Sequence, residues 1–297
     1  MKYKYSIIIP HKNVPKLLSR CLDTIPERDD LEVIIVDDCS SPEIVDFDNF
    51  PGKTRKNTIC IFDKSCKGAG RARNIGISKS QSEWLLFADA DDYFTDNLAT
   101  MLDKYVSNID TEIVYLNSQI VHENEDSIEP IRFQKLIRNY TKKRFYSEKA
   151  LRYSMYTPWS RMVRRNLVDK YDIQYEEVLT GNDAMFCLNC SKYAKKIAVF
   201  EPIVYNYFQP LEGSLCTKNR TKITNIEPRY LLGTRINALY DSVDYRIKES
   251  LLEGYLLTKD EARKNEYRRV FKKYSFNYIT AIFRLLVDRI ARKLDII

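Results

Sequence analysis

The stretch Trp84–Asp92 reads WLLFADADD, an apolar run that ends in three carboxylates. Five apolar residues in a row predict a buried β-strand, and the carboxylates emerge where that strand ends. In an extended backbone Asp89 and Asp91 point to the same side, so both can address one cation. A bound cation would offset the cost of crowding carboxylates beside a core. The alternative is a solvated turn in which Asp92 caps the following helix.

Short apolar runs alternate with helical patterns on both sides of this stretch. The predicted strands are Tyr5–Ile9, Glu32–Val36, Thr58–Phe62, Trp84–Ala88 and Glu112–Leu116, and the predicted helices are Pro15–Thr24, Ala69–Lys79 and Asn97–Ser107. This βαβα order predicts an α/β fold with a doubly wound, mostly parallel sheet and flanking helices. In such a sheet, ligands bind beyond the carboxyl ends of the strands. Three groups fall at those ends: Pro10, Asp37–Asp38 and Asp89–Asp91.

The second half of the chain is less regular. Residues 121–155 are polar and basic, and they predict an excursion from the sheet or simply a solvated face. A Pro-Trp turn at Pro158 is expected to lead into a helix. A second turn, at Gly181, precedes an apolar helix whose N-cap could be Asp183. From about Asn219 onward the pattern is helical throughout.

The composition limits the possible classes of function. The 297 residues, 44% of them hydrophobic, suffice for one large domain or one domain with an appendage. No apolar run approaches the ~18 residues of a membrane span, and the first apolar run is too short for a signal sequence, so we expect a cytoplasmic protein. Seven scattered cysteines argue against a disulfide framework. Because there are only two histidines, any metal must be held mainly by oxygen.

The positive charge is concentrated at the end of the chain. Of the net charge of +7, Glu261–Ile297 carries +6, with ten Lys or Arg residues against four acids. A nucleic-acid-binding surface would spread its charge differently, so we expect no nucleic-acid partner. Apolar residues at helical spacing within Tyr274–Ile297 predict a basic amphipathic helix, which is typical of binding to an anionic membrane surface. The alternative is a helix packed on the catalytic domain or on a partner chain.

The segment Gly68–Gly76 reads GAGRARNIG and precedes or begins a predicted helix. It is not a dinucleotide-binding motif, because Arg73 stands where that motif has its third glycine. Glycines before a helix still allow a phosphate to approach the backbone, and Arg71 and Arg73 add positive charge. The alternative is a plain helix start with solvated arginines.

Taken in order, these motifs resemble the GT-A-type glycosyltransferases of family 2. The resemblance is carried by the opening strand with Pro10 and Asn13, Val36–Ser40, Ala72–Gly76, Ala88–Asp92 and Gly181–Phe186. Trp159 with Arg161 resembles the family's Trp-x-Lys turn. Tyr205–Tyr207 with Gly213–Ser214 resembles the segment that closes the site. The likeness covers roughly residues 4–216.

On the donor side, the resemblance implies a nucleotide-sugar, with a UDP-sugar expected above other nucleotide-sugars. Asp38 would hydrogen-bond the base, and Pro10 would line the same pocket. Asp89 and Asp91 would hold the donor through ribose contacts and a divalent ion, Mn²⁺ or Mg²⁺, with Asp91 as the more direct ligand.

Arg71 and Arg73 would help to neutralise the diphosphate.

On the acceptor side, the resemblance implies an inverting transfer to a glycan or lipid-linked acceptor in the synthesis of a surface polysaccharide. Asp183 would act as the base that takes the proton from the acceptor hydroxyl. Trp159 and Arg161 would lie on the acceptor side. Such an enzyme would be cytoplasmic or bound peripherally to the cytoplasmic face of the inner membrane.

Three residues depart from the family pattern. Asn182 replaces the acid that usually precedes the base, Lys12 stands where an aromatic is common, and Phe208 stands where an arginine often follows the tyrosine pair. Two alternatives remain open: a nucleotidyltransferase, and a non-catalytic, membrane-associated scaffold on the same fold.

We expect a GT-A catalytic domain over residues 1–218, with a nucleotide-sugar-binding half at 1–120 and an acceptor half at 121–218. A helical, basic, amphipathic region would follow at 219–297.

Overall fold

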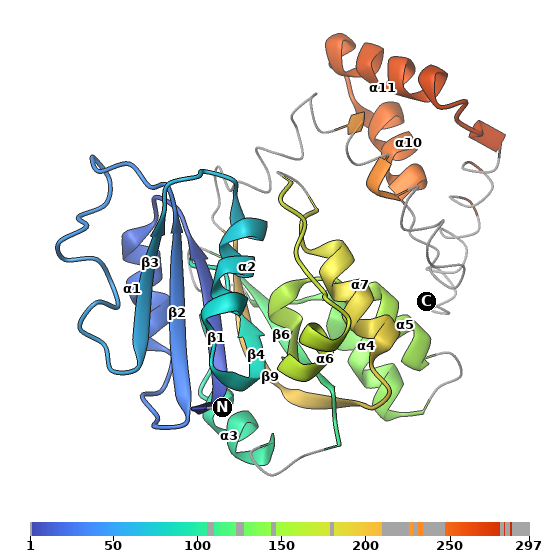
Figure 1. Ribbon diagram of the computed structural model, residues 1–297. Helices are drawn as coiled ribbons and strands as arrows, with labels where there is room; N and C mark the ends of the chain where they lie inside the picture. Colours follow the sequence, from blue (N-terminus) through green and yellow to red (C-terminus); the bar gives the residue numbers. More distant parts are fainter. Residues whose placement is uncertain are drawn as a thin grey trace. The chain divides into compact units, whose positions relative to one another are not determined.

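The computed structural model (Figure 1) describes residues 2–105, 110–122, 128–143, 147–178, 181–209, 226–227, 231–233, 247–279, 282 and 286. Contacts within the chain divide it into two compact units, Met1–Glu212 and Gly213–Ile297. The first unit contains the β-sheet, and the described parts of the second are helical.

The first unit is built on one sheet, which has nine strands within the described residues, in the order β3-β2-β1-β4-β8-β6-β9-β5, with β7 paired to β6. The strands are β1 Tyr3–His11, β2 Leu31–Asp38, β3 Thr58–Asp63, β4 Ser82–Phe87, β5 Tyr93–Phe94, β6 Ile113–His122, β7 Ile128–Pro130, β8 Arg161–Arg164 and β9 Ile197–Gln209. Strands β3, β2, β1 and β4 are parallel, as are β6 and β9. Strand β8 runs antiparallel to both β4 and β6. The predicted α/β sheet is therefore confirmed, with a parallel half and a mixed half.

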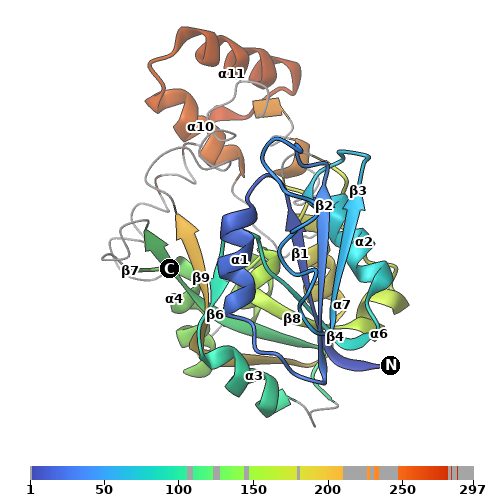
Figure 2. The same ribbon diagram turned by 90° about the vertical axis from the view of Figure 1, so that its left-hand side faces the viewer.

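The parallel half explains where ligands can bind. Every residue of β2 is buried, because helices cover both faces of a parallel sheet. Helices α1 (Pro15–Asp23) and α2 (Ala69–Lys79) lie on opposite faces, as Figures 1 and 2 show. Helix α2 lies so close to β1 that a Cβ atom on Gly76 would come within 2.3 Å of the Ile8 side chain. Because β1, β2 and β3 are parallel neighbours, their carboxyl ends meet at one edge of the sheet (Figure 2).

The mixed half contains the remaining helices. They are α3 Asn97–Tyr105, α4 Arg132–Thr141, α5 Ser147–Ser154, the 3₁₀ turn Pro158–Ser160, α6 Arg165–Lys170 and α7 Ala184–Tyr193. The predicted path after Pro158 is wrong in one respect, because β8 intervenes between the turn and α6. This strand has four residues, all buried between β4 and β6, and so short a segment shows no readable period.

Two cysteines that follow neighbouring strands form a disulfide. Cys39 comes directly after β2, and Cys66 lies in the connection from β3 to α2. The cysteine count argued against a disulfide framework, and it gave no sign of this single bond. The two residues meet because the ends of adjacent parallel strands lie side by side, a proximity that spacing along the chain does not reveal. Cys21, Cys60, Cys187 and Cys190 are free.

The second unit has its own small core. Helices α10 (Ile247–Leu257) and α11 (Glu261–Lys273) pack through Leu251, Leu252, Tyr267, Val270 and Phe271. Asp260 caps α11 by accepting the backbone N–H of Arg263. Most of the predicted amphipathic segment Tyr274–Ile297 lies outside the described residues. In the described part of the chain, none of the helices has the length and apolar character needed to cross a membrane.

Candidate active site

The carboxyl edge of the sheet brings together several of the predicted site residues. Arg73, in the second turn of α2, donates from Nη2 to Oδ1 of Asp89 (2.6 Å) and from Nη1 to Oδ1 of Asn182 (3.1 Å). Its side chain is buried, and the guanidinium also lies over the ring of Tyr175. One buried cation thus joins the loop after β4 to the segment before α7, although these segments are about ninety residues apart in the sequence.

The residues Asp89–Asp92, here called the carboxylate loop, are held from two sides. Arg20 of α1 donates from Nη2 to the backbone carbonyl of Asp91 (2.6 Å). From β9, Tyr205 donates its hydroxyl to Asp92 Oδ2 (2.8 Å), and the backbone N–H of Phe208 donates to Asp92 Oδ1 (2.8 Å). Asp92 therefore anchors the loop and does not cap the following helix. Sequence reasoning missed Arg20, since no local signal relates it to a loop 71 residues away.

The electrostatics of the carboxylate loop favour a cation. Burial, reinforced by Asp89, raises the pKa of Asp91 to about 6. Burial and the charges of Asp91 and Asp89 raise the pKa of Asp92 well above its usual range. A divalent ion near Asp89 and Asp91 would relieve this repulsion.

The protein alone does not form a complete metal cage. Within the described ranges, no three His, Cys, Asp or Glu side chains are grouped so that they could hold a metal ion. Mg²⁺ and similar ions are often bound by one or two carboxylates together with the phosphates of a substrate. Asp89 and Asp91 fit that kind of site, in which the ligand supplies the remaining oxygens.

Asp183 is the N-terminal neighbour of α7, but its side chain makes no capping hydrogen bond. The simpler interpretation of the sequence, in which the Asp183 carboxylate caps the helix, is therefore wrong. Burial raises the pKa of Asp183, Arg73 opposes this, and Asp89 adds to it. A carboxylate with a raised pKa, close to a buried cation, has properties suited to a general base.

Asp38 and Pro10 lie at the ends of β2 and β1. Both are buried, and Asp38 accepts the backbone N–H of Gly68 (2.9 Å) and the ammonium of Lys12 (3.1 Å). Lys12, at a position where the family often has an aromatic residue, thus forms an ion pair with Asp38. Beneath it, the buried pair His11–Asp37 (2.7 Å) fixes the end of β1 to the end of β2. That pair was not predicted as a site feature.

The N-terminal turn of α2 is tied to the segment before Asp183. Arg71 is partly exposed and bonds to Asp63 (3.1 Å) and Glu177 (3.3 Å). A Cβ atom on Gly70 would lie 2.1 Å from the carbonyl oxygen of Glu176, so only glycine fits there. Gly68, with φ +89°, has open space around it. The close approach of the Glu176 backbone thus accounts for the glycine at position 70.

Trp159 and Arg161 occupy different environments. Trp159 stacks on Tyr205 (5.1 Å between ring centroids) and on Tyr207 (5.8 Å). Arg161 is fully buried and donates to the carbonyl of Cys187 (2.8 Å) and to Ser191 (3.0 Å), both in α7. Arg161 begins β8 beside the carboxyl end of β4, since Met162 pairs with Leu86, but its side chain is directed into the protein and holds α7 from within. Gly213–Ser214, expected to close the site, lie outside the described residues.

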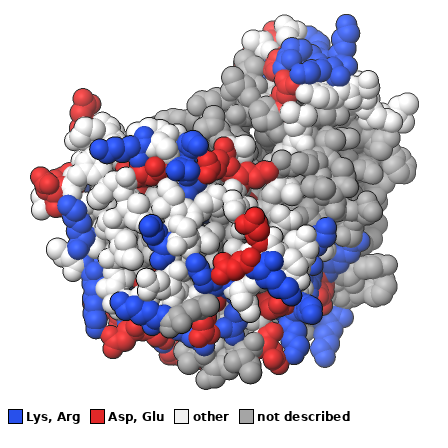
Figure 3. Space-filling view, viewed as in Figure 1, with Lys and Arg blue, Asp and Glu red and all other residues white. Residues whose placement is uncertain are grey.

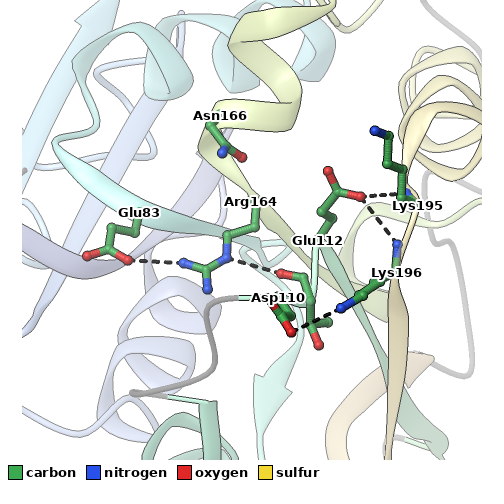
Figure 4. A pocket seen from close by; sticks show the side chains of 8 residues that line it. Glu83, Asp110, Glu112, Arg164, Asn166, Lys195 and Lys196 are labelled. Atoms are coloured by element: carbon green, nitrogen blue, oxygen red, sulfur yellow. Dashed lines mark hydrogen bonds and ion pairs between the residues drawn. The ribbon is translucent and has the colours of Figure 1, made fainter.

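A separate cavity of about 470 Å³ lies where β4, β8 and β6 meet the start of β9 (Figure 4). Its lining is charged, and the charges are largely paired within the protein. Arg164 bonds to Glu83 (3.0 Å), and Lys196 bonds to Asp110 (3.0 Å). None of the predicted site residues lines this cavity.

Basic and acidic side chains are interspersed over the face shown in Figure 3.

Known proteins resemble this chain over much of the first unit. Residues 6–172 match the family model described as Glycosyl transferase family 2. The chain is 22% identical over 215 residues to the poly(ribitol-phosphate) beta-N-acetylglucosaminyltransferase TarS of Staphylococcus aureus (strain MW2). This match covers 71% of this chain and 36% of TarS. It is 33% identical over 115 residues to a PGL/p-HBAD biosynthesis glycosyltransferase of Mycobacterium tuberculosis (strain ATCC 25177 / H37Ra), covering 37% of this chain and 45% of that protein. The chain thus spans less than half the length of these relatives.

Solved structures share the fold. The crystal structure of S. aureus TarS 1–349 in complex with UDP-GlcNAc has a TM-score of 0.69 at 18% identity, covering 91% of this chain and 80% of that one. A mannosyltransferase from Pyrobaculum calidifontis in complex with GDP-Man and Mn²⁺ has a TM-score of 0.55 at 13% identity, covering 99% and 81%. At such identities the likeness concerns the fold alone.

Proposed function

This chain belongs to glycosyl transferase family 2 and has its GT-A fold, and from that premise we propose that it is an inverting, metal-dependent enzyme of surface polysaccharide synthesis. It would move a sugar from a nucleotide-sugar to a hydroxyl of a glycan or lipid-linked acceptor. The observation that carries the proposal is the position of Arg73, which bonds to Asp89 and to Asn182 beside Asp183. Asp89, proposed for the donor side, and the residue next to Asp183, proposed for the acceptor side, thus bind the same arginine.

The donor is proposed to be a UDP-sugar. Support comes from the TarS structure, which was solved with UDP-GlcNAc. In this chain Asp38 and Pro10 would bind the base at the ends of β2 and β1. Arg73, and Arg71 at the mouth of the site, would lie on the side of the diphosphate, next to the N-terminus of α2.

Asp89 and Asp91 would hold Mn²⁺ or Mg²⁺ together with the diphosphate oxygens. Such an ion stabilises the negative charge that grows on the diphosphate as it leaves. A mannosyltransferase of the same fold was solved with Mn²⁺. Once the donor is bound, Arg73 would add a fixed positive charge on the same side, because its side chain is buried and cannot swing into solvent.

Asp183 is proposed to take the proton from the acceptor hydroxyl as its oxygen attacks the anomeric carbon from the face opposite the diphosphate. No second protein acid is required, because the leaving diphosphate needs no proton. Asn182 contributes a neutral amide where the family usually has an acid. It accepts a hydrogen bond from Arg73 and does not neutralise the positive charge of that arginine. The named β-transferase activities of TarS and of a Bacillus spizizenii poly(ribitol-phosphate) beta-glucosyltransferase support an inverting reaction.

The enzyme is proposed to work at the cytoplasmic face of the membrane. Ile279, Ile282 and Leu286 are exposed apolar residues at helical spacing, in the part of the chain where the excess of Lys and Arg is found. Exposed apolar groups next to basic ones favour an anionic lipid surface.

Trp159, stacked on Tyr207, would lie on the acceptor side of the first unit.

The test is thermal stabilisation by a panel of nucleoside diphosphates and nucleotide-sugars, with and without Mn²⁺. We expect a Mn²⁺-dependent rise in melting temperature for uridine nucleotides, lost in Asp91→Ala and kept in Asp48→Ala, which removes an exposed carboxylate. With the cognate acceptor, Asp183→Asn should keep the donor shift and lose transfer by at least about 100-fold. No shift with any nucleotide would favour the scaffold alternative, and release of pyrophosphate from a nucleoside triphosphate would favour a nucleotidyltransferase.

A further inference from the structure

Tyr205 of β9 hydrogen-bonds to the carboxylate loop through its side chain. Its hydroxyl donates to Asp92 Oδ2 (2.8 Å) and accepts the backbone N–H of Asp89 (2.9 Å). One hydroxyl therefore bridges the first and the last residue of the loop. Because the phenol has one proton and gives it to Asp92, its lone pair is left to receive the amide of Asp89.

Asp92 itself cannot face a ligand. It is fully buried, and its other oxygen accepts the backbone N–H of Phe208. Burying a carboxylate costs free energy unless it is hydrogen-bonded. Because Asp92 receives two hydrogen bonds from β9, the loop and the strand are held together. The orientation of Asp89 and Asp91 then depends on where β9 lies.

The Tyr205 ring is fixed as well. It is fully buried, lies parallel to Trp159 with ring planes 10° apart, and meets the edge of Phe94 at 5.2 Å. Phe94 is the β5 residue paired with Tyr205 in the sheet. Trp159 is thus in direct contact with the residue that holds the carboxylate loop, so the acceptor side and the donor side share one aromatic ring.

We propose that Tyr205 is a positioning residue of the transfer site, and that its hydroxyl holds Asp89 and Asp91 in the geometry that a metal-bound nucleotide requires. This rests on the proposed function, in which the two carboxylates bind the ion. Tyr205 acts through the loop and not by touching the donor. A purely structural tyrosine would affect the stability of the fold without changing the metal dependence of nucleotide binding.

The experiment compares Tyr205→Phe with Tyr5→Phe in the full chain. Tyr5 is a matched control, because it is also fully buried and its hydroxyl donates to a distant partner, the carbonyl of Leu102 (2.6 Å). The dissociation constant of UDP is measured by calorimetry with and without Mn²⁺, alongside the melting temperature. We expect Tyr205→Phe to weaken UDP binding about tenfold in Mn²⁺ and by less than about twofold without it, since both hydrogen bonds of the bridging hydroxyl are removed. Tyr5→Phe should change neither constant.

Each outcome has a separate meaning. Equal effects of the two variants on binding in Mn²⁺ would overturn the positioning role. A wild-type protein whose binding of UDP or GDP does not depend on Mn²⁺ would overturn the proposed function instead. If Tyr205→Phe does not fold, Asp92→Asn is the second variant, because an amide has one acceptor oxygen and cannot accept both the Tyr205 hydroxyl and the Phe208 N–H, so one of the two bonds from β9 to the loop is lost. We expect the same selective loss of Mn²⁺-dependent binding, and unchanged binding would again contradict the proposal.

Discussion

Asp91 is deprotonated at neutral pH in an environment that disfavours its charge. Burial, with the charge of Asp89, raises its pKa to about 6, so the folded protein holds this proton more tightly than the unfolded chain. A raised pKa contributes stability that is complete below the unfolded value and is lost as the pH rises through the folded one. Near pH 6 and above, Asp91 therefore destabilises the folded protein.

This predicts that Asp91→Asn stabilises the protein at pH 8 and does so hardly at all at pH 4. The gain at pH 8 should be roughly 1–3 kcal/mol, since one pKa unit corresponds to about 1.4 kcal/mol and Asp91 keeps some contact with solvent. Urea unfolding at the two pH values measures it, with Asp48→Asn as the exposed control. An equal effect at both pH values would show that the charge of Asp91 is not the cause. The same variant should lose Mn²⁺-dependent nucleotide binding, so stability and function would change in opposite directions.

The sequence indicated that Asp89 and Arg73 lie at the carboxyl edge of the sheet, but it did not indicate the residues that hold the carboxylate loop in place. Asp89 and Arg73 could be chosen as site residues because they stand in short, ordered motifs at strand and helix ends. Arg20 and Tyr205 could not be assigned their contacts, because each reaches the carboxylate loop from a distant element. Arg161 carried a family-like motif, yet its burial against α7 depends on the packing of two elements.

The contact between α2 and the segment before α7 leads to a prediction about whole elements. Gly70→Ala would place a methyl group against the carbonyl of Glu176, and backbone cannot yield as a flexible side chain does. We expect a loss of roughly 1–3 kcal/mol in stability and a drop in transfer activity, because the segment that carries Asp183 must shift. Unfolding and acceptor-dependent turnover are measured against Ser78→Ala, an exposed position on the same helix, which should stay within about 0.5 kcal/mol of wild type. Wild-type stability in Gly70→Ala would mean that this contact is easily relaxed.

Elements with a strong local pattern were predicted closely. Helix α2 was expected over Ala69–Lys79 and is found there, because two glycines mark its start and its buried residues recur at helical spacing. Strands β1 and β2 each extend two residues beyond the carboxyl end of their apolar runs, since hydrogen bonding to neighbouring strands continues past the apolar residues, whereas β3 and β4 end within one residue of their predicted ends. Strand β8 was missed because its buried positions include arginines, which are placed there by partners from other elements.

The whole chain consists of two units with separate cores. All the described strands and the larger core lie within Met1–Glu212, while Leu251, Tyr267 and Phe271 belong to the core of the second unit. We therefore predict that a fragment of residues 1–212 unfolds cooperatively and keeps Mn²⁺-dependent nucleotide binding. The full chain should sediment with anionic vesicles more than with neutral ones, and less at high salt, whereas the fragment should not. Equal sedimentation of both proteins would refute the role given to the C-terminal region.

The disulfide between Cys39 and Cys66 makes a covalent ring of the chain that runs through β3. Part of that ring is an exposed turn that includes Pro42, Glu43 and Ile44. A protease that cuts this turn would produce two pieces still joined through sulfur. The nicked protein would migrate as one band without reductant and as two with it, while the strand order of the sheet, and the edge on which Asp38 lies, would survive the cut.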